Sequence, residues 1–240
     1  ETAGYLEGQY TWSHPDVHRL HGSATSVSII GQLYGSLVDP NTVWDDLSYK
    51  TAEAEVRVSA MCAALVGYDA DKALGLFTFG GTGTTLYGIK LGAERAQPGL
   101  FNDGLRQPLR VFGSDVAHYA KLSSSAWLGL GGQAAVSVPT GEDNAIDVAA
   151  LEKALRACIE KGERIAAIVV TMGSTDAFGV DDIEAVHALR LRLAKEYQLD
   201  YVPYLHADAV IGWYASACAT CRWLIRWVLI FTKAVICFMY

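Results

Sequence analysis

The feature that most constrains the fold is a glycine- and threonine-rich turn between an apolar run and a helical pattern. The apolar run, residues 76–79, is expected to end a strand, and the turn occupies residues 80–85. Apolar residues then recur at helical spacing from Leu86 to Ala93. Open backbone N–H groups, threonine hydroxyls and the positive end of a helix dipole together favour a phosphate site. A purely structural turn explains this segment equally well when it is taken alone.

The rest of the chain alternates between apolar runs, polar loops and helical patterns. Strands are expected at residues 110–113, 134–138, 165–170 and 201–211. Helices are expected at residues 26–37, 44–66, 86–97, 147–161, from 116 onward and from 181 onward. The uninterrupted apolar run 165–170 is typical of a parallel strand that is covered on both faces. The alternation therefore predicts the α/β class, with a mostly parallel sheet covered by helices.

Open parallel sheets bind ligands beyond the carboxyl ends of their strands. The turn at 81–85, the polar loop at 173–179 and Asp208 each follow a predicted strand. These three segments are therefore expected at one edge of the sheet, where they can reach a single ligand.

The 240 residues suffice for one α/β domain with a sizeable core. The formal net charge of −7 and the lack of a basic stripe argue against a nucleic-acid partner. Five scattered cysteines do not suggest a disulfide framework, so a reducing, cytoplasmic location is expected. The first residues lack the basic start and apolar core of a signal peptide. Because the first residue is not Met, the chain is interpreted as a fragment.

Two groups of potential metal ligands occur in the sequence, and neither predicts a metal site. His14, His18 and His21 are close in sequence, but Pro15 interrupts the helix that would align them. The single Cys218-x-x-Cys221 motif lacks the second pair that a zinc site requires.

The last residues, 223–240, are apolar over nearly the length of a membrane span, but they include Arg226 and Lys233. A buried segment whose cover is missing is therefore a better interpretation than a membrane helix. The expected organisation is an N-terminal segment (1–44), a large domain (45–213) and an apolar tail of uncertain structure (214–240).

Four motifs resemble those of one enzyme family, and they occur in the family's order. The motifs are Phe-Gly-Gly-Thr-Gly-Thr (79–84), Ser-Asp-Val-Ala-His-Tyr (114–119), Thr-Met-Gly-Ser-Thr (171–175, with Asp-Asp-Ile at 181–183) and Leu-His-Ala-Asp-Ala-Val-Ile-Gly (205–212). Over roughly residues 25–213 the chain resembles the group II pyridoxal 5′-phosphate (PLP)-dependent amino-acid decarboxylases, which include the aromatic amino-acid and glutamate decarboxylases. The resemblance implies the large domain of the aspartate-aminotransferase fold type I, incomplete at its C-terminal side. It also implies a homodimer that decarboxylates an L-amino acid through a Schiff base with PLP.

The resemblance also implies a role for each matching residue. The predicted cofactor-binding residues are Thr82, Gly83 and Thr84 at the phosphate, His118 stacked on the pyridine ring, Thr175 in contact with the cofactor, and Asp208 paired with the pyridine nitrogen. His118 and Asp208 are also the predicted catalytic residues, together with Lys233. A carboxylate beside the pyridine nitrogen keeps that nitrogen protonated, so that the ring can accept the electrons released with carbon dioxide.

Three positions leave alternatives open. Asp181 and His206 lie within the motifs, and each is expected either to support the site indirectly or to be structural. The family's Schiff-base lysine usually follows a histidine, whereas the only candidate here, Lys233, follows Thr232. An inactive fragment or pseudoenzyme is therefore the main alternative function. Another PLP reaction, such as transamination or carbon–sulfur cleavage, is a further one.

Overall fold

The computed structural model describes residues 24–41, 43–66, 68–212 and 235–239. The chain divides into two compact units, with the boundary between Ala54 and Glu55, inside helix α3 (Lys50–Leu65). The sequence pattern predicts a boundary after residue 44, where a helical pattern begins. The histidines at 14, 18 and 21, the Cys218-x-x-Cys221 motif and Lys233 lie outside the described residues.

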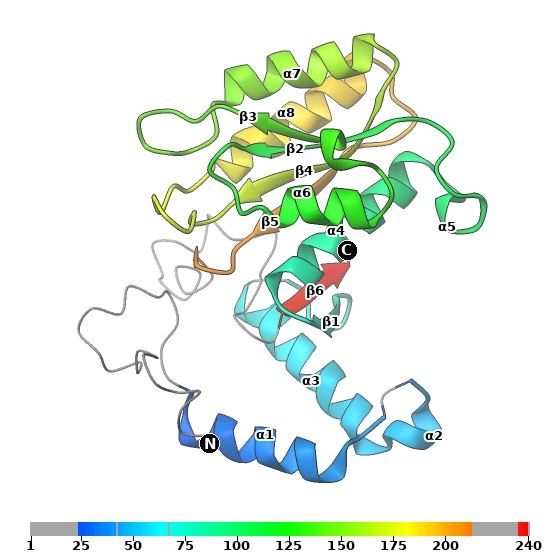
Figure 1. Ribbon diagram of the computed structural model, residues 1–240, viewed down its shortest axis with the longest axis vertical. Coiled ribbons are helices and arrows are strands. Elements are labelled where there is room, and N and C mark those ends of the chain that lie inside the picture. Colours follow the sequence, from blue (N-terminus) through cyan, green and yellow to red (C-terminus); the bar gives the residue numbers. More distant parts are fainter. Residues whose placement is uncertain (1–23, 42, 67, 213–234, 240) are drawn as a thin grey trace, which may run out of the picture. The chain divides into compact units, whose positions relative to one another are not determined.

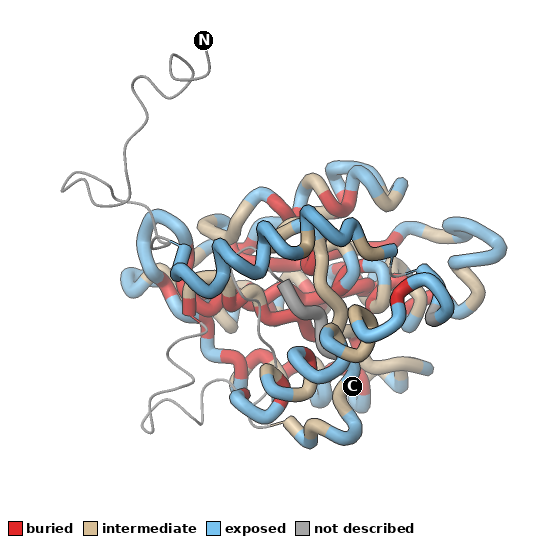
Figure 2. Tube along the Cα trace, turned by 90° about the horizontal axis from the view of Figure 1, so that it is seen from below, coloured by how far each residue is buried: buried red, intermediate tan, exposed pale blue. Residues whose placement is uncertain are grey.

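The first unit contains α1 (Ser26–Val38), α2 (Asp45–Ser48) and the start of α3. The Thr25 hydroxyl caps α1 by accepting a hydrogen bond from the Ser28 N–H at 3.3 Å, and this confirms the predicted helix. No residue of α1 is buried, as Figure 2 shows. The helical pattern at 44–66 forms two helices instead of one, because Tyr49 adopts a left-handed conformation (φ 46°) between them.

The second unit is built on a four-stranded parallel sheet, which confirms the predicted α/β class. Its strands are β2 (Leu109–Ser114), β3 (Ala135–Val138), β4 (Arg164–Thr171) and β5 (Tyr204–Asp208), in the order β3-β2-β4-β5. The central strand β4 is buried over all but its first residue, as its continuous apolar run predicts.

Helices cover both faces of this sheet (Figure 1). On one face lie α7 (Val148–Glu160) and α8 (Ile183–Glu196), and on the other lie α4 (Gly81–Ala96) and α6 (Ala120–Trp127). Alternate β4 side chains enter two separate cores: Ile168 packs with α7 and α8, whereas Val169 packs with α4. Two short elements, α5 (Leu100–Asp103) and the 3-10 helix η2 (Gly132–Ala134), complete the described helices. None of the helices in the described ranges is long and apolar enough to cross a membrane.

The strand before the glycine-rich turn does not join the parallel sheet. This strand, β1 (Leu74–Thr78), pairs antiparallel with β6 (Val235–Met239), a segment of the predicted apolar tail. The expectation that the turn follows a strand of the main sheet is therefore wrong. The helix after the turn, α4, still packs across β4 and β5, so its first turn lies at the carboxyl edge of the sheet.

The segment between β2 and α6 is longer than predicted, because α6 begins at Ala120 and not at Val116. The Asp115 N–H bonds to the Val138 carbonyl at 2.8 Å, and the Ala117 N–H bonds to the Ser114 carbonyl at 3.2 Å. These bonds hold residues 115–117 in turns before the helix begins. As a result, His118 lies on the connection between strand and helix, beyond the edge of the sheet.

Candidate active site

A cavity of about 240 Å³ opens at the carboxyl ends of β4 and β5 and the start of α4. Its lining residues are Gly81, Thr82, His118, Tyr119, Gly173, Thr175, Asp208, Val210 and Ile211. Four of the residues predicted from the sequence, Thr82, His118, Thr175 and Asp208, therefore meet around one space. They come from four segments that are far apart in the sequence, which the parallel topology brings to one edge.

The first turn of α4 forms one wall of the cavity. Gly80 precedes the helix with φ 102°, and no side chain caps the helix start. The first N–H groups of an uncapped helix lack helical partners and carry the positive end of the dipole. A Cβ atom on Gly81 would lie 2.8 Å from Cγ2 of Val210, so glycine permits the helix start to approach the loop after β5. The wall is therefore suited to an anionic group.

The three predicted phosphate residues do not all face the cavity. Thr82 lines it, whereas Gly83 and Thr84 are buried behind it. The Thr84 hydroxyl lies 3.0 Å from the Thr78 hydroxyl, which itself donates to the Gly80 carbonyl at 2.9 Å. Thr84 thus fixes the shape of the turn, and Thr82 supplies the hydroxyl at its surface.

Asp208 lies at the end of β5 and lines the cavity together with the start of α4. Its carbonyl accepts the Met172 N–H at 2.7 Å, and its carboxylate Oδ1 accepts the Val210 N–H at 3.2 Å. Burial raises the pKa of the Asp208 carboxyl, against the opposing effects of the Val210 N–H and the His118 imidazole. A cation placed in the cavity would reverse this rise by stabilising the carboxylate.

His118 is oriented by the helix that follows it. Its Nδ1 atom accepts the Ala120 N–H at 3.1 Å, so in the neutral ring the proton lies on Nε2. The imidazole lies beside the Tyr119 ring, with 4.1 Å between the ring centroids. His118 and Tyr119 together give the cavity an aromatic wall next to Asp208.

Thr175 belongs to the polar loop after β4, whose shape depends on Gly173 and Gly179. Gly173 has φ 104°, and its N–H bonds to the Gly179 carbonyl at 3.1 Å. A Cβ atom on Gly179 would overlap the backbone of Asn144, so only glycine fits there. Thr175 is exposed at the mouth of the cavity.

Gly81 and Gly173 also line the cavity, and they belong to the two segments that the sequence predicts at the ligand. Sequence reasoning missed three lining residues, Tyr119, Val210 and Ile211. All three lie inside the motifs, so proximity to the motif residues could have suggested them. Among the residues that the structure describes, no lysine lines the cavity.

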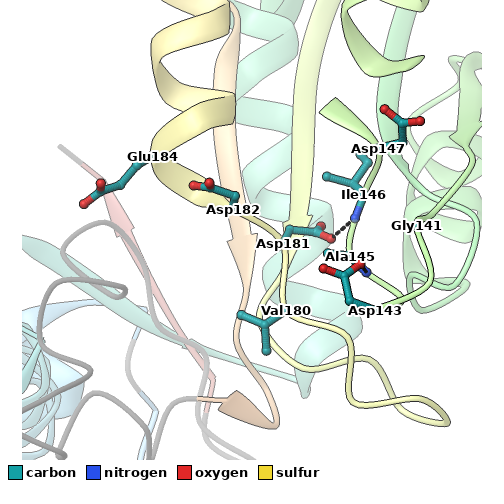
Figure 3. A pocket seen from close by; sticks show the side chains of 9 residues that line it. All are labelled: Gly141, Asp143, Ala145, Ile146, Asp147, Val180, Asp181, Asp182 and Glu184. Atoms are coloured by element: carbon teal, nitrogen blue, oxygen red, sulfur yellow. Dashed lines mark hydrogen bonds between the residues drawn. The ribbon is translucent and has the colours of Figure 1, made fainter. Parts of the chain in front are cut away.

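Asp181 does not line this cavity, and its carboxylate has a structural role. Its carboxylate accepts the Ile146 N–H at 2.7 Å (Figure 3) and the Thr171 N–H at 2.6 Å, which joins the loop of Ile146 to the end of β4. Burial raises the pKa of Asp181, and the two N–H groups oppose that rise.

Asp181 also borders a separate hollow of about 580 Å³ that includes Asp143, Asp147 and Asp182. Within the described ranges, no group of His, Cys, Asp and Glu side chains is arranged to hold a metal ion.

His206 is also outside the cavity, two residues before Asp208 on β5. It is 1% exposed, and its imidazole packs against Gly88 of α4, where a Cβ atom would lie 2.5 Å from Nδ1. Burial lowers the pKa of His206 to about 4, so the ring is neutral near pH 7. His206 therefore packs α4 onto the strand that carries Asp208.

The fold is an α/β domain with a polar cavity at the carboxyl edge of its sheet, and comparison with known proteins identifies its family. The conserved domain of the pyridoxal-dependent decarboxylases matches residues 6–228. The chain belongs to this family, whose cofactor is PLP.

The chain is similar to curated decarboxylases over part of their length. It is 31% identical over 173 residues to an L-2,4-diaminobutyrate decarboxylase of Acinetobacter baumannii, covering 66% of this chain and 32% of that protein. It is 35% identical over 100 residues to an L-tyrosine decarboxylase of Levilactobacillus brevis, covering 42% of this chain and 16% of that protein. The chain thus spans about a third or less of these relatives.

Solved structures share the fold. The glutamate decarboxylase domain of a Vibrio parahaemolyticus diaminobutyrate-pyruvate transaminase and L-2,4-diaminobutyrate decarboxylase has a TM-score of 0.77 at 22% identity, covering 90% of this chain and 47% of that one. Oryza sativa TDC with PLP and tryptamine has a TM-score of 0.73 at 19% identity, covering 90% and 48%. These similarities confirm the fold type I assignment.

Proposed function

We propose that this chain forms the cofactor-binding part of a PLP-dependent carboxy-lyase, which converts an L-amino acid to its amine and carbon dioxide. The observation that carries the proposal is the meeting of Thr82, His118, Thr175 and Asp208 around one cavity. Each comes from a different motif, and each supplies a different kind of contact. A structural turn alone would not require an imidazole and a carboxylate to face the same space.

The residues around the cavity fit PLP chemically. The uncapped start of α4 and the Thr82 hydroxyl suit a phosphate, with Gly83 and Thr84 holding the turn in shape. The His118 imidazole offers a flat face for an aromatic ring. Asp208 has one N–H partner and a pKa that burial raises, so a cationic ring nitrogen would complete its environment.

When bound, PLP supplies a protonated ring that accepts the electron pair left as carbon dioxide departs. The chain's contribution is to hold that proton in place and to orient the reacting groups. The Asp208 carboxylate would keep the ring nitrogen charged through electrostatic attraction. His118, with its proton on Nε2, would lie against the ring of the cofactor and keep water from it. Thr175 would contact the cofactor from the mouth of the cavity.

Lys233 is the proposed covalent attachment point for the cofactor, because it is the only lysine that follows Asp208 in the sequence. The test is to incubate the protein with PLP, reduce it with borohydride and map the labelled peptide. Label on Lys233 is expected. Label on another lysine would refute this assignment, and the absence of any stable label would favour the pseudoenzyme alternative.

The decarboxylase activity itself is tested by carbon dioxide release from a panel of L-amino acids. The panel follows the substrates named for the relatives, L-2,4-diaminobutyrate and L-tyrosine, with L-glutamate and L-aspartate added. PLP-dependent release from at least one of them is expected. Conversion without carbon dioxide release would instead indicate transamination or carbon–sulfur cleavage.

We further propose that the protein acts as a homodimer in the cytoplasm. Large apolar side chains of α1 are exposed, among them Val27, Leu33 and Leu37 at 80%, 59% and 76%. Covering them would remove apolar surface from water, which favours association. Light scattering on the purified protein is expected to give the mass of two chains, and a monomeric mass would contradict this proposal.

Replacing Thr82 with alanine is expected to weaken PLP binding by about ten- to a hundredfold, because a hydrogen bond to a charged group contributes roughly 1.5–3 kcal/mol. The measurement is a direct titration of the unloaded protein with PLP. Thr84→Ala is the comparison, because its hydroxyl contacts Thr78 rather than the cavity. It is expected to weaken binding by less. Equal affinity of Thr82→Ala and the parent protein would show that the turn is only structural.

A further inference from the structure

Lys121 is a buried cation that lies outside the cavity, on the first turn of α6. It is 5% exposed. Its ammonium group donates to the Gly113 carbonyl at 3.0 Å, the Ser114 carbonyl at 3.1 Å and the Ser137 hydroxyl at 3.3 Å. A lysine has three N–H donors, and all three are satisfied by acceptors at the carboxyl ends of two adjacent strands, β2 and β3. Lys121 therefore ties α6 to the edge of the sheet.

The sheet is shaped to admit this side chain. A Cβ atom on Gly113 would lie 3.1 Å from Cδ of Lys121 and 3.0 Å from the Val169 carbonyl. A residue larger than glycine at this position would press on the lysine stem. The close fit of stem and strand indicates a specific placement of the ammonium group, in contrast to the solvent-exposed position that lysine usually takes.

The anchored turn is the one that orients His118. The Lys121 N–H bonds to the His118 carbonyl at 3.4 Å, and the Ala120 N–H bonds to the His118 Nδ1 atom at 3.1 Å. The connection from β2 is thus held at its far end by α6, and α6 is held by Lys121. A movement of this first turn would move the N–H that fixes the imidazole.

We propose that Lys121 is a positioning residue that, by anchoring the first turn of α6 to β2 and β3, fixes the tautomer and direction of His118 at the cavity. For its effect on cofactor binding, this inference rests on the proposed PLP function. The position of His118 itself is independent of the cofactor and can be measured without it.

The charge of Lys121 indicates that its positioning of His118 can be separated from its contribution to the stability of the fold. Burial lowers the pKa of Lys121 to about 8, while the carboxylates of Asp115 and Asp181 act in the opposite direction. The charged ammonium group is therefore costly to bury, and an apolar side chain of similar length would avoid that cost. A residue kept only for stability would not be expected to carry this charge.

The test is Lys121→Met in the full chain, compared with Lys153→Met on α7, where the lysine is exposed. Nitrogen NMR shifts of the histidine imidazoles, measured without PLP and assigned through a His118→Gln variant, report the tautomer. In Lys121→Met the His118 signals are expected to change from the single Nε2–H tautomer to a mixture of tautomers. PLP affinity is expected to fall about tenfold, while the melting temperature stays within about 4 °C or rises. Lys153→Met is expected to change none of the three.

Unchanged His118 signals in a folded Lys121→Met variant would overturn the inference. If that variant does not fold, Ser137→Ala removes only one of the three acceptors and leaves the charge in place. Ser137→Ala is then expected to shift the His118 signals in the same direction by a smaller amount, and unchanged signals would again overturn the inference. If the His118 signals shift but even the parent protein does not bind PLP, the positioning role stands and the proposed function fails.

Discussion

Replacing Asp208 with asparagine is expected to reduce decarboxylation a hundredfold or more, while PLP still binds. Asparagine keeps the size of the side chain but carries no charge, so it cannot hold a proton on the ring nitrogen. Loss of one preorganised electrostatic contact of this kind typically costs about 10²–10³ in rate. The phosphate contacts at the start of α4 are untouched by the change. We therefore expect the loss in turnover rate at saturating PLP, with a smaller effect in the PLP titration.

The matched control is Asp200→Asn, which makes the same chemical change at a surface position. The Asp200 side chain is 70% exposed and pairs with Arg164 at 2.6 Å. Exposed ion pairs contribute little to stability, so this variant should retain nearly full turnover. If Asp208→Asn also retained turnover within about tenfold, equivalent to about 1.4 kcal/mol in the barrier, the role assigned to Asp208 would be wrong.

Much of the fold could be predicted from the sequence, because parallel strands and amphipathic helices produce strong local patterns. The apolar run of β4 is one example. Another is Asp147, whose side chain caps α7 by accepting the Ala149 and Ala150 N–H groups. The start of α6 was misplaced by four residues, because hydrogen bonds to a neighbouring strand hold residues 115–117 outside the helix. The pairing of β1 with β6 was missed, since it joins segments that are far apart in the sequence.

The candidate site was predictable where motifs lie at strand ends, since the topology brings those ends together. What the motifs could not indicate is the direction of each side chain. Thr82 and Thr84 are equivalent in the sequence, yet contact with Thr78 turns only Thr84 away from the cavity. From the sequence alone, Lys121 is expected on the exposed surface of a helix. Its burial depends on hydrogen-bond acceptors contributed by β2 and β3. The direction of the Thr84 side chain and the burial of Lys121 therefore both depend on contacts made in the folded structure, which the motifs do not show.

The small residues of α4 bring this helix against the sheet, so enlarging one of them is expected to be strongly destabilising. Gly92 is the most constrained, because a Cβ atom there would overlap the carbonyl of Ala166 in β4 and lie 2.9 Å from Cβ of Tyr204 in β5. Gly88 faces the imidazole of His206 instead. A side chain can give way by rotating, whereas the backbone of a central strand cannot. The cost should therefore be larger at Gly92 than at Gly88.

Gly92→Ala is expected to lower the free energy of unfolding by about 3 kcal/mol or more, since overpacking against a rigid backbone forces α4 away from the sheet. The corresponding fall in melting temperature is roughly 6–12 °C for a protein of this size. Urea unfolding followed by circular dichroism measures the effect. The control is Gly35→Ala in α1, where nothing lies within 4 Å of the added methyl group. There the better helix propensity of alanine should stabilise by about 0.5–1 kcal/mol.

The comparison between Gly92 and Gly88 separates close packing from a general intolerance of α4 to substitution. In Gly88→Ala the obstacle is a side chain, so adding His206→Ala should recover part of the lost stability through a coupling between the two sites. No side-chain substitution can remove the Ala166 carbonyl, so Gly92→Ala should not be rescued by the same change. If Gly92→Ala were as stable as the parent, α4 could not lie as close to β4 as described. The position of its first turn at the cavity would then need revision, because the same helix carries Gly81 and Thr82.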